Sequence, residues 1–264
     1  MHITITGNLG SGKSTVARII SEKYNFEVYS TGKVQREIAR QMNLSTLELN
    51  QLMMSDHKYD NMIDDTVARI SRENRDKDII FDSRLAWHFV EYSFKVFVTV
   101  NLDVAAERIM KDQRGSVESY SSIEEAKALL AERAKTEMIR YKEIYNLNYM
   151  DFSNYNLVID GTYCTPDTMA DVIVNEAKEF YANPDKPLLR LVSPKSFLLE
   201  GISEEEEKVR LEGMIKQLKG REYIKDRVIK ARQQEGKFIA AEDTDYVKAA
   251  FFAGVSFISI EVVG

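Results

Sequence analysis

Short apolar runs alternate with helical patterns along the first two thirds of the chain. The apolar runs are HITIT (2–6), EVYS (27–30), DIIFD (78–82), KVFVTV (95–100) and NLVID (156–160). Apolar positions three or four apart predict helices from Lys13, from Gly32, and over 103–110, 122–146 and 165–181. Apolar runs separated by crossover helices are typical of a parallel sheet covered on both faces. We therefore predict an α/β fold with a five-stranded parallel sheet flanked by helices.

The caps of two helices can be predicted from the sequence. Thr165 precedes Pro166, which suits an N-cap followed by proline at the first helical position. Ser122 and Glu125 have the spacing of a capping box at the start of the long helix. Both helices should begin at these residues.

Proline marks a boundary near residues 183–188. All four prolines lie between Pro166 and Pro194, and ANPDKP follows a helical pattern that can hardly continue through it. After it, the pattern predicts a strand from 189, a charged helix near 203–219, a hairpin over 227–241, and a helix and a strand over 246–263. We predict two domains, 1–183 and 188–264, the second a small α+β domain, with few contacts across the boundary.

Composition and charge limit the possible partners and the cellular location of the protein. The 264 residues carry a net charge of −6, which argues against general affinity for nucleic acid. The stretch 208–232 is an exception, because nine Lys and Arg stand against three Asp and Glu, and we interpret it as a solvated face. No run approaches the roughly 20 apolar residues of a membrane helix, and no signal-peptide pattern precedes the first strand. A cytoplasmic location without membrane contact is expected.

The segment TITGNLGSGKSTVARII contains a glycine, four residues and then Gly-Lys-Ser between a predicted strand and a predicted helix. Backbone N–H groups in such a loop wrap a triphosphate, so ATP or GTP should bind here. The loop comprises Gly7, Asn8, Leu9, Gly10, Ser11, Gly12, Lys13, Ser14 and Thr15. Lys13 should reach the β- and γ-phosphates, and Ser14 should bind Mg²⁺. Asp82, at the end of the strand 78–82, is the second candidate Mg²⁺ residue; capping of the strand is the alternative.

Arginines indicate the phosphoryl acceptor. A phosphate monoester needs no base to attack, but fixed guanidiniums must hold the two anions together. Arg84 stands after the third strand, with a structural ion pair as the alternative. The other candidates are Arg36, Arg108, Arg114, Arg133 and Arg140. The last four surround DQRGSVESYSS (112–122), which has the composition of a mobile lid.

Residues 1 to about 181 resemble a nucleoside monophosphate kinase of the cytidylate kinase-like family, a P-loop NTPase family. The resemblance runs in order through GNLGSGKSTVARIISEKY, YSTGKVQREIA, DHKYDNMIDD, IIFDSRLAW, AAERIMKD, ERAKTEMIRYKEIY and NYNLVIDGT. It implies that Arg36 and Arg84, with Thr31 and Gly32, hold the acceptor phosphate. It also implies that Arg108 lies against the donor nucleotide, and that Arg84, Arg133 and Arg140 act on the transferring group.

The same resemblance makes 43–75 the cover of the acceptor nucleotide. Asp56, Asp60 and Asp64 recur there every four residues, on one face if the segment is helical throughout. A carboxylate can accept the amino group of cytosine, so Asp60 and Asp64 are candidate base readers. A solvated acidic face is the alternative.

The C-terminal part weakly resembles a ParB/sulfiredoxin-like module. Asp243 and Tyr246 stand where that family has a glycine and an arginine, and Glu242, Asp243 and Asp245 should repel a phosphate. The resemblance implies a degenerate module without a nucleotide site. We expect it to serve as a docking surface for a protein partner or as a regulatory surface.

The leading interpretation is a nucleoside monophosphate kinase that uses ATP and Mg²⁺ and phosphorylates CMP or dCMP. A small-metabolite kinase would need a carboxylate base beside a hydroxyl acceptor, and a nucleotide-sensing regulator would bind without turnover. A GTPase switch is disfavoured, because NLDVAAE (101–107) provides no NKxD-like guanine reader. The sequence leaves the acceptor base, the sugar and the oligomeric state open.

Overall fold

The computed structural model describes residues 1–55, 58–111, 121–199 and 203–263, with only the backbone of Glu37, Met54 and Ser55. The predicted lid, including Arg114, falls largely outside the described residues, as does Asp56. The strands are β1 His2–Gly7, β2 Glu27–Ser30, β3 Ile79–Asp82, β4 Phe94–Thr99, β5 Leu157–Asp160, β6 Leu189–Val192, β7 Tyr223–Gln234, β8 Lys237–Ala240 and β9 Phe257–Val262. The helices are α1 Lys13–Tyr24, α2 Thr31–Gln41, α3 Thr46–Ser55, α4 Lys58–Glu73, α5 Ala86–Phe89, α6 Leu102–Lys111, α7 Ile123–Tyr145, α8 Pro166–Ala182, α9 Glu204–Arg210, α10 Glu212–Leu218 and α11 Thr244–Phe252. Short 3-10 turns, η2 Phe152–Asn154 and η3 Pro194–Ser196, follow α7 and β6.

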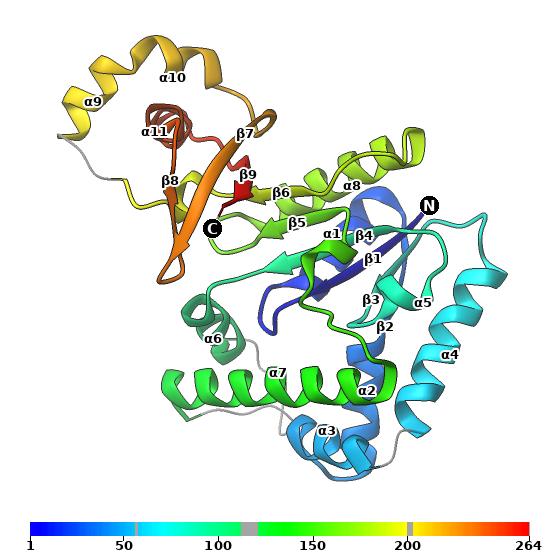
Figure 1. The fold of residues 1–264 in the computed structure, drawn as a ribbon. Helices are drawn as coiled ribbons and strands as arrows, with labels where there is room; N and C mark the ends of the chain where they lie inside the picture. The colour runs from blue at the N-terminus through cyan, green and yellow to red at the C-terminus, as the bar shows by residue number, and fades with distance from the viewer. Residues whose placement is uncertain (56–57, 112–120, 200–202, 264) are drawn as a thin grey trace.

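The predicted α/β fold is confirmed. Strands β2, β3, β1, β4 and β5 pair in that order, all in parallel. Helices α1 and α8 cover one face, where Ile3, Ile5, Val98 and Ile159 form the main core (Figure 1). On the other face, Phe97 and Val158 pack with the aromatic side chains that follow α7. The predicted α8 cap is present, because Thr165 accepts a hydrogen bond from the N–H of Thr168 and Pro166 opens the helix.

The sheet does not end at β5. Strand β6 pairs in parallel with β5, β9 pairs antiparallel with β6, and β7 and β8 complete a nine-stranded sheet (Figure 1). Leu191 and Phe257 lie in the same core as Ile5. The expectation of few contacts across 183–188 is therefore wrong, because an apolar strand following the linker completes the edge of β5.

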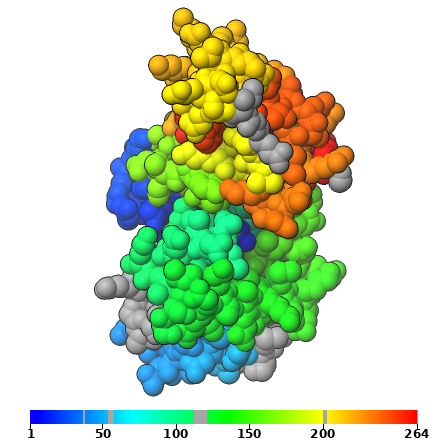
Figure 2. All heavy atoms as spheres, turned by 90° about the vertical axis from the view of Figure 1, so that its left-hand side faces the viewer, coloured from blue at the N-terminus to red at the C-terminus, as the bar shows by residue number. Residues whose placement is uncertain are grey.

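The C-terminal part nevertheless has a core of its own. Strand, helix, hairpin, helix and strand follow in the predicted order, although the charged segment forms two short helices, α9 and α10, which meet at Leu211. Leu218, Ile224, Val247 and Ile260 are buried together there. The division into two domains stays a prediction, since two cores share one sheet. Figure 2 shows this part, yellow to red, as a lobe above the remainder.

The acidic loop of this lobe is paired with cations. Glu242 binds Lys230, Asp243 binds Arg227, and Asp245 binds Arg210. These ion pairs remove much of the charge on which the predicted rejection of phosphate rested. The ParB-like resemblance and the lack of a nucleotide site stay predictions. The same pairs neutralise part of the basic stretch 208–232.

Two local predictions need correction. Segment 43–75 holds two helices, α3 and α4, and Asp60 and Asp64 both lie in α4 and are buried. The solvated-face alternative for these two residues is therefore wrong. Ser122 caps α7 as predicted, because its side chain accepts a hydrogen bond from the N–H of Glu125. The Glu125 carboxylate accepts from the N–H of Ser121 and not from that of Ser122, so the predicted capping box is incomplete.

None of the helices in the described part of the chain combines the length and apolar character needed to span a membrane. The cytoplasmic location stays a prediction.

Candidate active site

The loop between β1 and α1 has the close contacts that its glycines predict. Gly7 has a φ of 149°, and a Cβ there would stand 2.2 Å from the carbonyl oxygen of Val98. Gly10, with a φ of 73°, leaves room only for hydrogen against Ala105. The Asn8 N–H donates to the Val98 carbonyl at 3.0 Å, which anchors the loop to β4. Side chains larger than hydrogen at either glycine would displace the loop.

Lys13 lies at the start of α1 and folds over the loop. Its Nζ donates to the carbonyl oxygens of Gly7 at 3.1 Å and Asn8 at 2.7 Å, and to Ser11 Oγ at 3.4 Å. Burial, together with repulsion from Arg84, holds the pKa of the Lys13 ammonium well below its usual value. Three neutral oxygens therefore hold the Lys13 Nζ at the loop.

Ser14 and Asp82, the two candidate Mg²⁺ residues, are in contact. Ser14 Oγ donates to Asp82 Oδ2 at 2.7 Å, and Ser30 Oγ donates to the same oxygen at 2.9 Å. Ser30 is the register partner of Asp82 in the β2–β3 pair, which explains its position. Sequence reasoning missed Ser30 as a site residue, although it ends the second predicted strand and lies within the segment YSTGKVQREIA.

A cavity of about 130 Å³ opens beside these residues. The predicted residues in its wall are Leu9, Gly10, Gly12, Lys13, Ser14, Thr15, Thr31, Gly32, Arg36, Asp82, Arg84 and Arg133. Gln35, Ser83 and Glu137 also line it and were not predicted. The structure thus brings the loop, the start of α2 and one face of α7 together around one space.

A buried carboxylate joins two of the arginines. Glu137 accepts from Arg84 Nε at 2.8 Å and from Arg133 Nε at 3.1 Å. Burial alone would raise the pKa of Glu137, but Arg84, Arg133 and Arg140 lower it to about 2. Burial would lower the pKa of Arg84, yet Glu137 outweighs it and raises the pKa above its usual value. The structural ion pair considered for Arg84 is therefore present, and it leaves Arg84 in the cavity wall.

Arg140 contacts residues of α3 and α4. It is fully buried, donates to the Asn50 side chain at 2.6 Å, and stands 3.4 Å from Asp60 Oδ2 without hydrogen-bond geometry. It does not line the cavity around Lys13 in the described chain. Its action on the transferring group stays a prediction, and here it holds α3, α4 and α7 together.

Asp64 has an unusual environment. Tyr145 Oη donates to Asp64 Oδ2 at 2.6 Å. Burial and the nearby Asp60 raise the pKa of Asp64 to about 7, although the Tyr145 hydrogen bond opposes the shift. Asp60, Asp64 and Arg84 line a small pocket that also borders Thr31, Gln35 and Ser83. Both candidate base readers therefore lie next to the larger cavity.

Arg108, near the end of α6, lies behind the loop. Its guanidinium donates to the Gly161 carbonyl at 2.7 Å and to the Ser11 carbonyl at 3.5 Å. The side chain of Asn8 also lies away from the predicted phosphate site, because it lines a different cavity. Of the remaining loop residues, the described lining of the cavity beside Lys13 includes Leu9, Gly10, Gly12, Lys13, Ser14 and Thr15, but not Gly7 or Ser11.

A parallel sheet whose first strand leads into a phosphate loop, with Lys13, a Ser14–Asp82 contact and clustered arginines, defines a P-loop kinase. The model of the cytidylate kinase-like family matches residues 2–163, more than half of the chain. The chain belongs to this family and is a nucleoside monophosphate kinase.

Individual relatives agree with this assignment. A cytidylate kinase of Natronomonas pharaonis is 38% identical over 187 residues, 70% of this chain and 93% of the relative. A cytidylate kinase of Haloarcula marismortui is 32% identical over 188 residues, covering 70% and 94%. The fold is shared with an uncharacterized protein from Eubacterium ventriosum, with a TM-score of 0.50 and 18% identity, over 67% of this chain and 98% of that one.

Proposed function

We propose that the protein transfers the γ-phosphoryl group of ATP to CMP or dCMP, giving ADP and the corresponding diphosphate. The observation that carries the proposal is the convergence of Lys13, Arg36, Arg84 and Arg133 on one cavity at the phosphate loop. The named relatives are cytidylate kinases, which supports cytosine as the acceptor base.

Each cation of the site is proposed to bind ATP, the acceptor phosphate or the transferring group. Lys13 and the loop N–H groups hold the β- and γ-phosphates of ATP, and Arg108 supports the loop from behind. Arg36 and Arg84, with Thr31 and Gly32, hold the acceptor phosphate. Arg133 faces the transferring group from α7. Fixed guanidiniums reduce the repulsion between two anions before and during transfer.

Ser14 and Asp82 are proposed to hold Mg²⁺. Both present oxygen atoms, the ligand type that Mg²⁺ prefers, and their 2.7 Å contact shows that they already point at one another. When bound, Mg²⁺ neutralises charge on the β- and γ-phosphates. Ser30 holds the Asp82 carboxylate in this orientation through its own hydrogen bond.

The acceptor phosphate is proposed to attack without a base. One of its oxygens forms the new bond to the γ-phosphorus while the bond to the ADP oxygen breaks. Glu137, the cavity carboxylate bound by two arginines, has a pKa of about 2 and would accept a proton poorly near neutral pH. This agrees with an anionic nucleophile.

One observation favours a second candidate, a kinase with a hydroxyl acceptor. Asp64 has a pKa of about 7 and borders the pocket next to Arg84, so it could take a proton from a hydroxyl. Asp64→Asn separates the two functions. If Asp64 reads the base, the variant should lose its preference for CMP over UMP and retain turnover. If Asp64 is a general base, the variant should lose turnover of the hydroxyl acceptor.

The substrate assay uses the full chain with ATP and CMP, dCMP, UMP, AMP or GMP, and with cytidine as the matched hydroxyl acceptor. ADP formation should give the highest kcat/KM with CMP or dCMP. Turnover of cytidine but of none of the monophosphates would contradict the proposal. Tight binding of ATP and CMP without turnover would instead indicate a nucleotide sensor.

A further inference from the structure

A second cavity lies where the C-terminal lobe meets the kinase part. It measures about 400 Å³ and opens at the carboxyl ends of β4 and β5, where α/β proteins commonly bind ligands. Strand β6 and the β7–β8 hairpin supply its other walls. Figure 2 shows the orange hairpin reaching toward the teal and green surface. The described lining of this cavity shares no residue with that of the cavity around Lys13.

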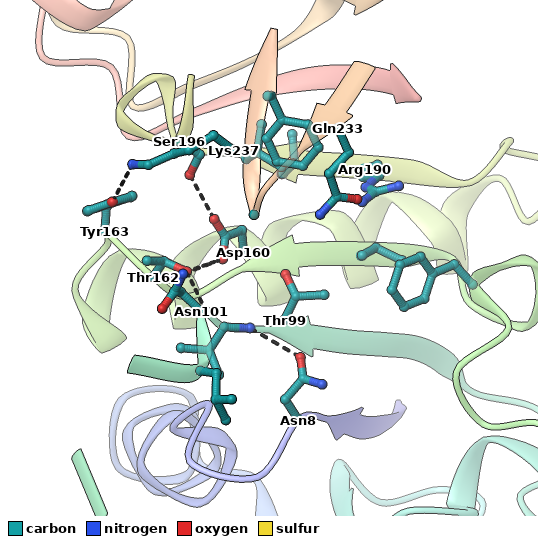
Figure 3. A pocket seen from close by; sticks show the side chains of 18 residues that line it. Asn8, Thr99, Asn101, Asp160, Thr162, Tyr163, Arg190, Ser196, Gln233 and Lys237 are labelled. Atoms are coloured by element: carbon teal, nitrogen blue, oxygen red, sulfur yellow. Dashed lines mark hydrogen bonds between the residues drawn. The ribbon is translucent and has the colours of Figure 1, made fainter. Parts of the chain in front are cut away.

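Arg190 gives this cavity its charge. In β6, Leu191 faces the main core, so strand alternation turns Arg190 to the opposite face. Its guanidinium lies 5.3 Å from the Phe152 ring centroid and 5.6 Å from that of Phe238. Among the described residues, it has no hydrogen bond and no ion pair within 4 Å, although burial lowers its pKa and the nearby charge of Asp160 partly opposes that shift. Figure 3 labels Arg190 and Gln233 among the side chains that line the cavity.

The carboxylate of the cavity is already occupied by internal hydrogen bonds. Asp160 accepts from Thr162 Oγ1 at 2.6 Å and from Ser196 Oγ at 2.9 Å (Figure 3). Lys237 Nζ donates to Tyr163 Oη at 2.7 Å, a neutral partner. The cavity thus contains two cationic side chains, Arg190 and Lys237, and one carboxylate, Asp160, whose oxygens already accept hydrogen bonds. This excess of positive charge favours an anionic ligand.

The neutral lining adds hydrogen-bonding capacity. Asn8, Asn101 and Gln233 present carboxamides around the same space, and Phe152 and Phe238 present aromatic rings. A concave site of this size, with apolar walls and a few polar groups, suits a small molecule. A guanidinium binds phosphate, as it binds carboxylate, through paired hydrogen bonds, and a second cation at Lys237 suits the higher charge of a phosphate.

We propose that this cavity is a second ligand site that binds a phosphorylated small molecule, with its phosphate held by Arg190 and Lys237. Three of the residues that form it, Arg190, Gln233 and Lys237, follow the segment 2–163 that matches the kinase family. The site is therefore a property of the C-terminal lobe combined with the kinase core. Asn8 connects the two sites, because its side chain lines this cavity while its carbonyl oxygen accepts from Lys13.

The test is calorimetric titration of the full chain with its active site saturated by adenosine and cytidine joined through five phosphates. The probes are CTP, ATP, inorganic pyrophosphate and glucose 6-phosphate, which distinguish nucleotides from other phosphates. At least one probe should give an additional binding event with a stoichiometry of one. Arg190→Gln should weaken it at least about tenfold, Arg190→Lys should weaken it less, and Arg75→Gln, an exposed arginine paired with Glu91, should leave it unchanged.

Gln233→Leu provides a second variant at an exposed hairpin position, so that a folding defect of Arg190→Gln does not decide the result. It too should weaken the additional event. The proposal is overturned if none of the four probes gives an additional event up to about 1 mM. It is also overturned if the event persists unchanged in both Arg190→Gln and Gln233→Leu.

Discussion

At the scale of single residues, Lys13 shows how the loop prepares for an anion. The ammonium is held by the oxygens of Gly7, Asn8 and Ser11, and its pKa is lowered by burial and by Arg84. A phosphate at the loop would replace neutral acceptors with a charged one, which strengthens the hydrogen bond. The stabilisation should be largest where charge develops during transfer.

Lys13→Ala should lower kcat by roughly 10²–10³-fold, because it removes a cation aimed at the transferring group. Far-UV circular dichroism should match that of the wild type. Lys23→Ala, at an exposed lysine paired with Asp171, is the control and should leave kcat unchanged. A folded Lys13→Ala protein with normal turnover would contradict the phosphate-loop assignment.

Asp64 should make stability depend on pH. Its pKa is about 7 in the folded chain and about 3.9 when unfolded, so the folded state binds the extra proton between these values. The free energy of unfolding should fall as pH rises from about 4 to 7, and this contribution should be constant above 7.

Asp64→Asn should remove this dependence. The free energy of unfolding of the variant should exceed that of the wild type by an amount that grows as pH rises from about 4 to 7. At pH 8 this difference should be on the order of 2–4 kcal/mol. Urea unfolding at pH 5, 6, 7 and 8 measures the trend, with Asp65→Asn, at its exposed neighbour, as the control. A difference between variant and wild type that does not change with pH would show that Asp64 does not titrate as described.

At the scale of elements, α7 collects the charged groups of the site. Arg133 and Glu137 are four residues apart on the face toward Arg84, and Arg140 follows on the turn that contacts α3 and α4. Because side chains four apart share a helix face, the spacing alone places the first two together. The helix thus positions cations at the cavity and also connects the cavity to its cover.

Glu137→Gln should destabilise the protein by about 3 kcal/mol at pH 7, because Arg84 and Arg133 lose their buried counter-charge. The pKa of Glu137 is lowered to about 2, so its contribution is present above the unfolded pKa of about 4.3 and is lost as pH falls toward 2. The deficit of the variant should therefore shrink in acid. Urea unfolding at pH 7 and pH 3 measures it.

Glu143→Gln, on the exposed side of α7, serves as the control and should change little at either pH. If Glu137→Gln is as stable as the wild type at pH 7, the two arginines do not depend on this carboxylate for their burial.

At the scale of the whole molecule, one sheet carries both parts of the chain. Leu191 and Phe257 enter the core beneath α1 and α8, and Tyr223 and Lys225 bind Glu176 of α8 at 2.6 Å each. The C-terminal lobe therefore supports the kinase part although it contributes none of the residues proposed for phosphoryl transfer.

A chain ending at residue 184 should keep turnover within a few-fold of the full chain, because every proposed transfer residue precedes that point. It should melt at a lower temperature and aggregate more readily, since β5 becomes an open edge and core contacts are lost. Differential scanning calorimetry and the coupled assay measure both effects. A folded but inactive truncation would mean that the lobe takes part in catalysis, and an unchanged melting temperature would mean that its contacts do not stabilise the core.

The sequence by itself determined the local elements and the motif of this protein. The five parallel strands, the phosphate loop, the caps at Ser122 and Thr165 and the arginine spacing all follow from periodicity, steric requirements of glycine and short-range hydrogen bonding. The sequence also indicated Ser14 and Asp82 as the two candidate Mg²⁺ residues, and the structure adds that they are in contact.

Only the tertiary structure decided which distant groups meet. Glu137 pairs with Arg84, Arg140 binds Asn50, and Tyr145 binds the buried Asp64. Strand β6 extends the sheet beyond β5. Each of these contacts joins residues that are far apart in the chain. No local pattern specifies such contacts, because they depend on how whole helices and strands pack and on where buried charges find partners. The cavity at Arg190 exists for the same reason: its walls come from strands that are separated in sequence and become neighbours only in the folded sheet.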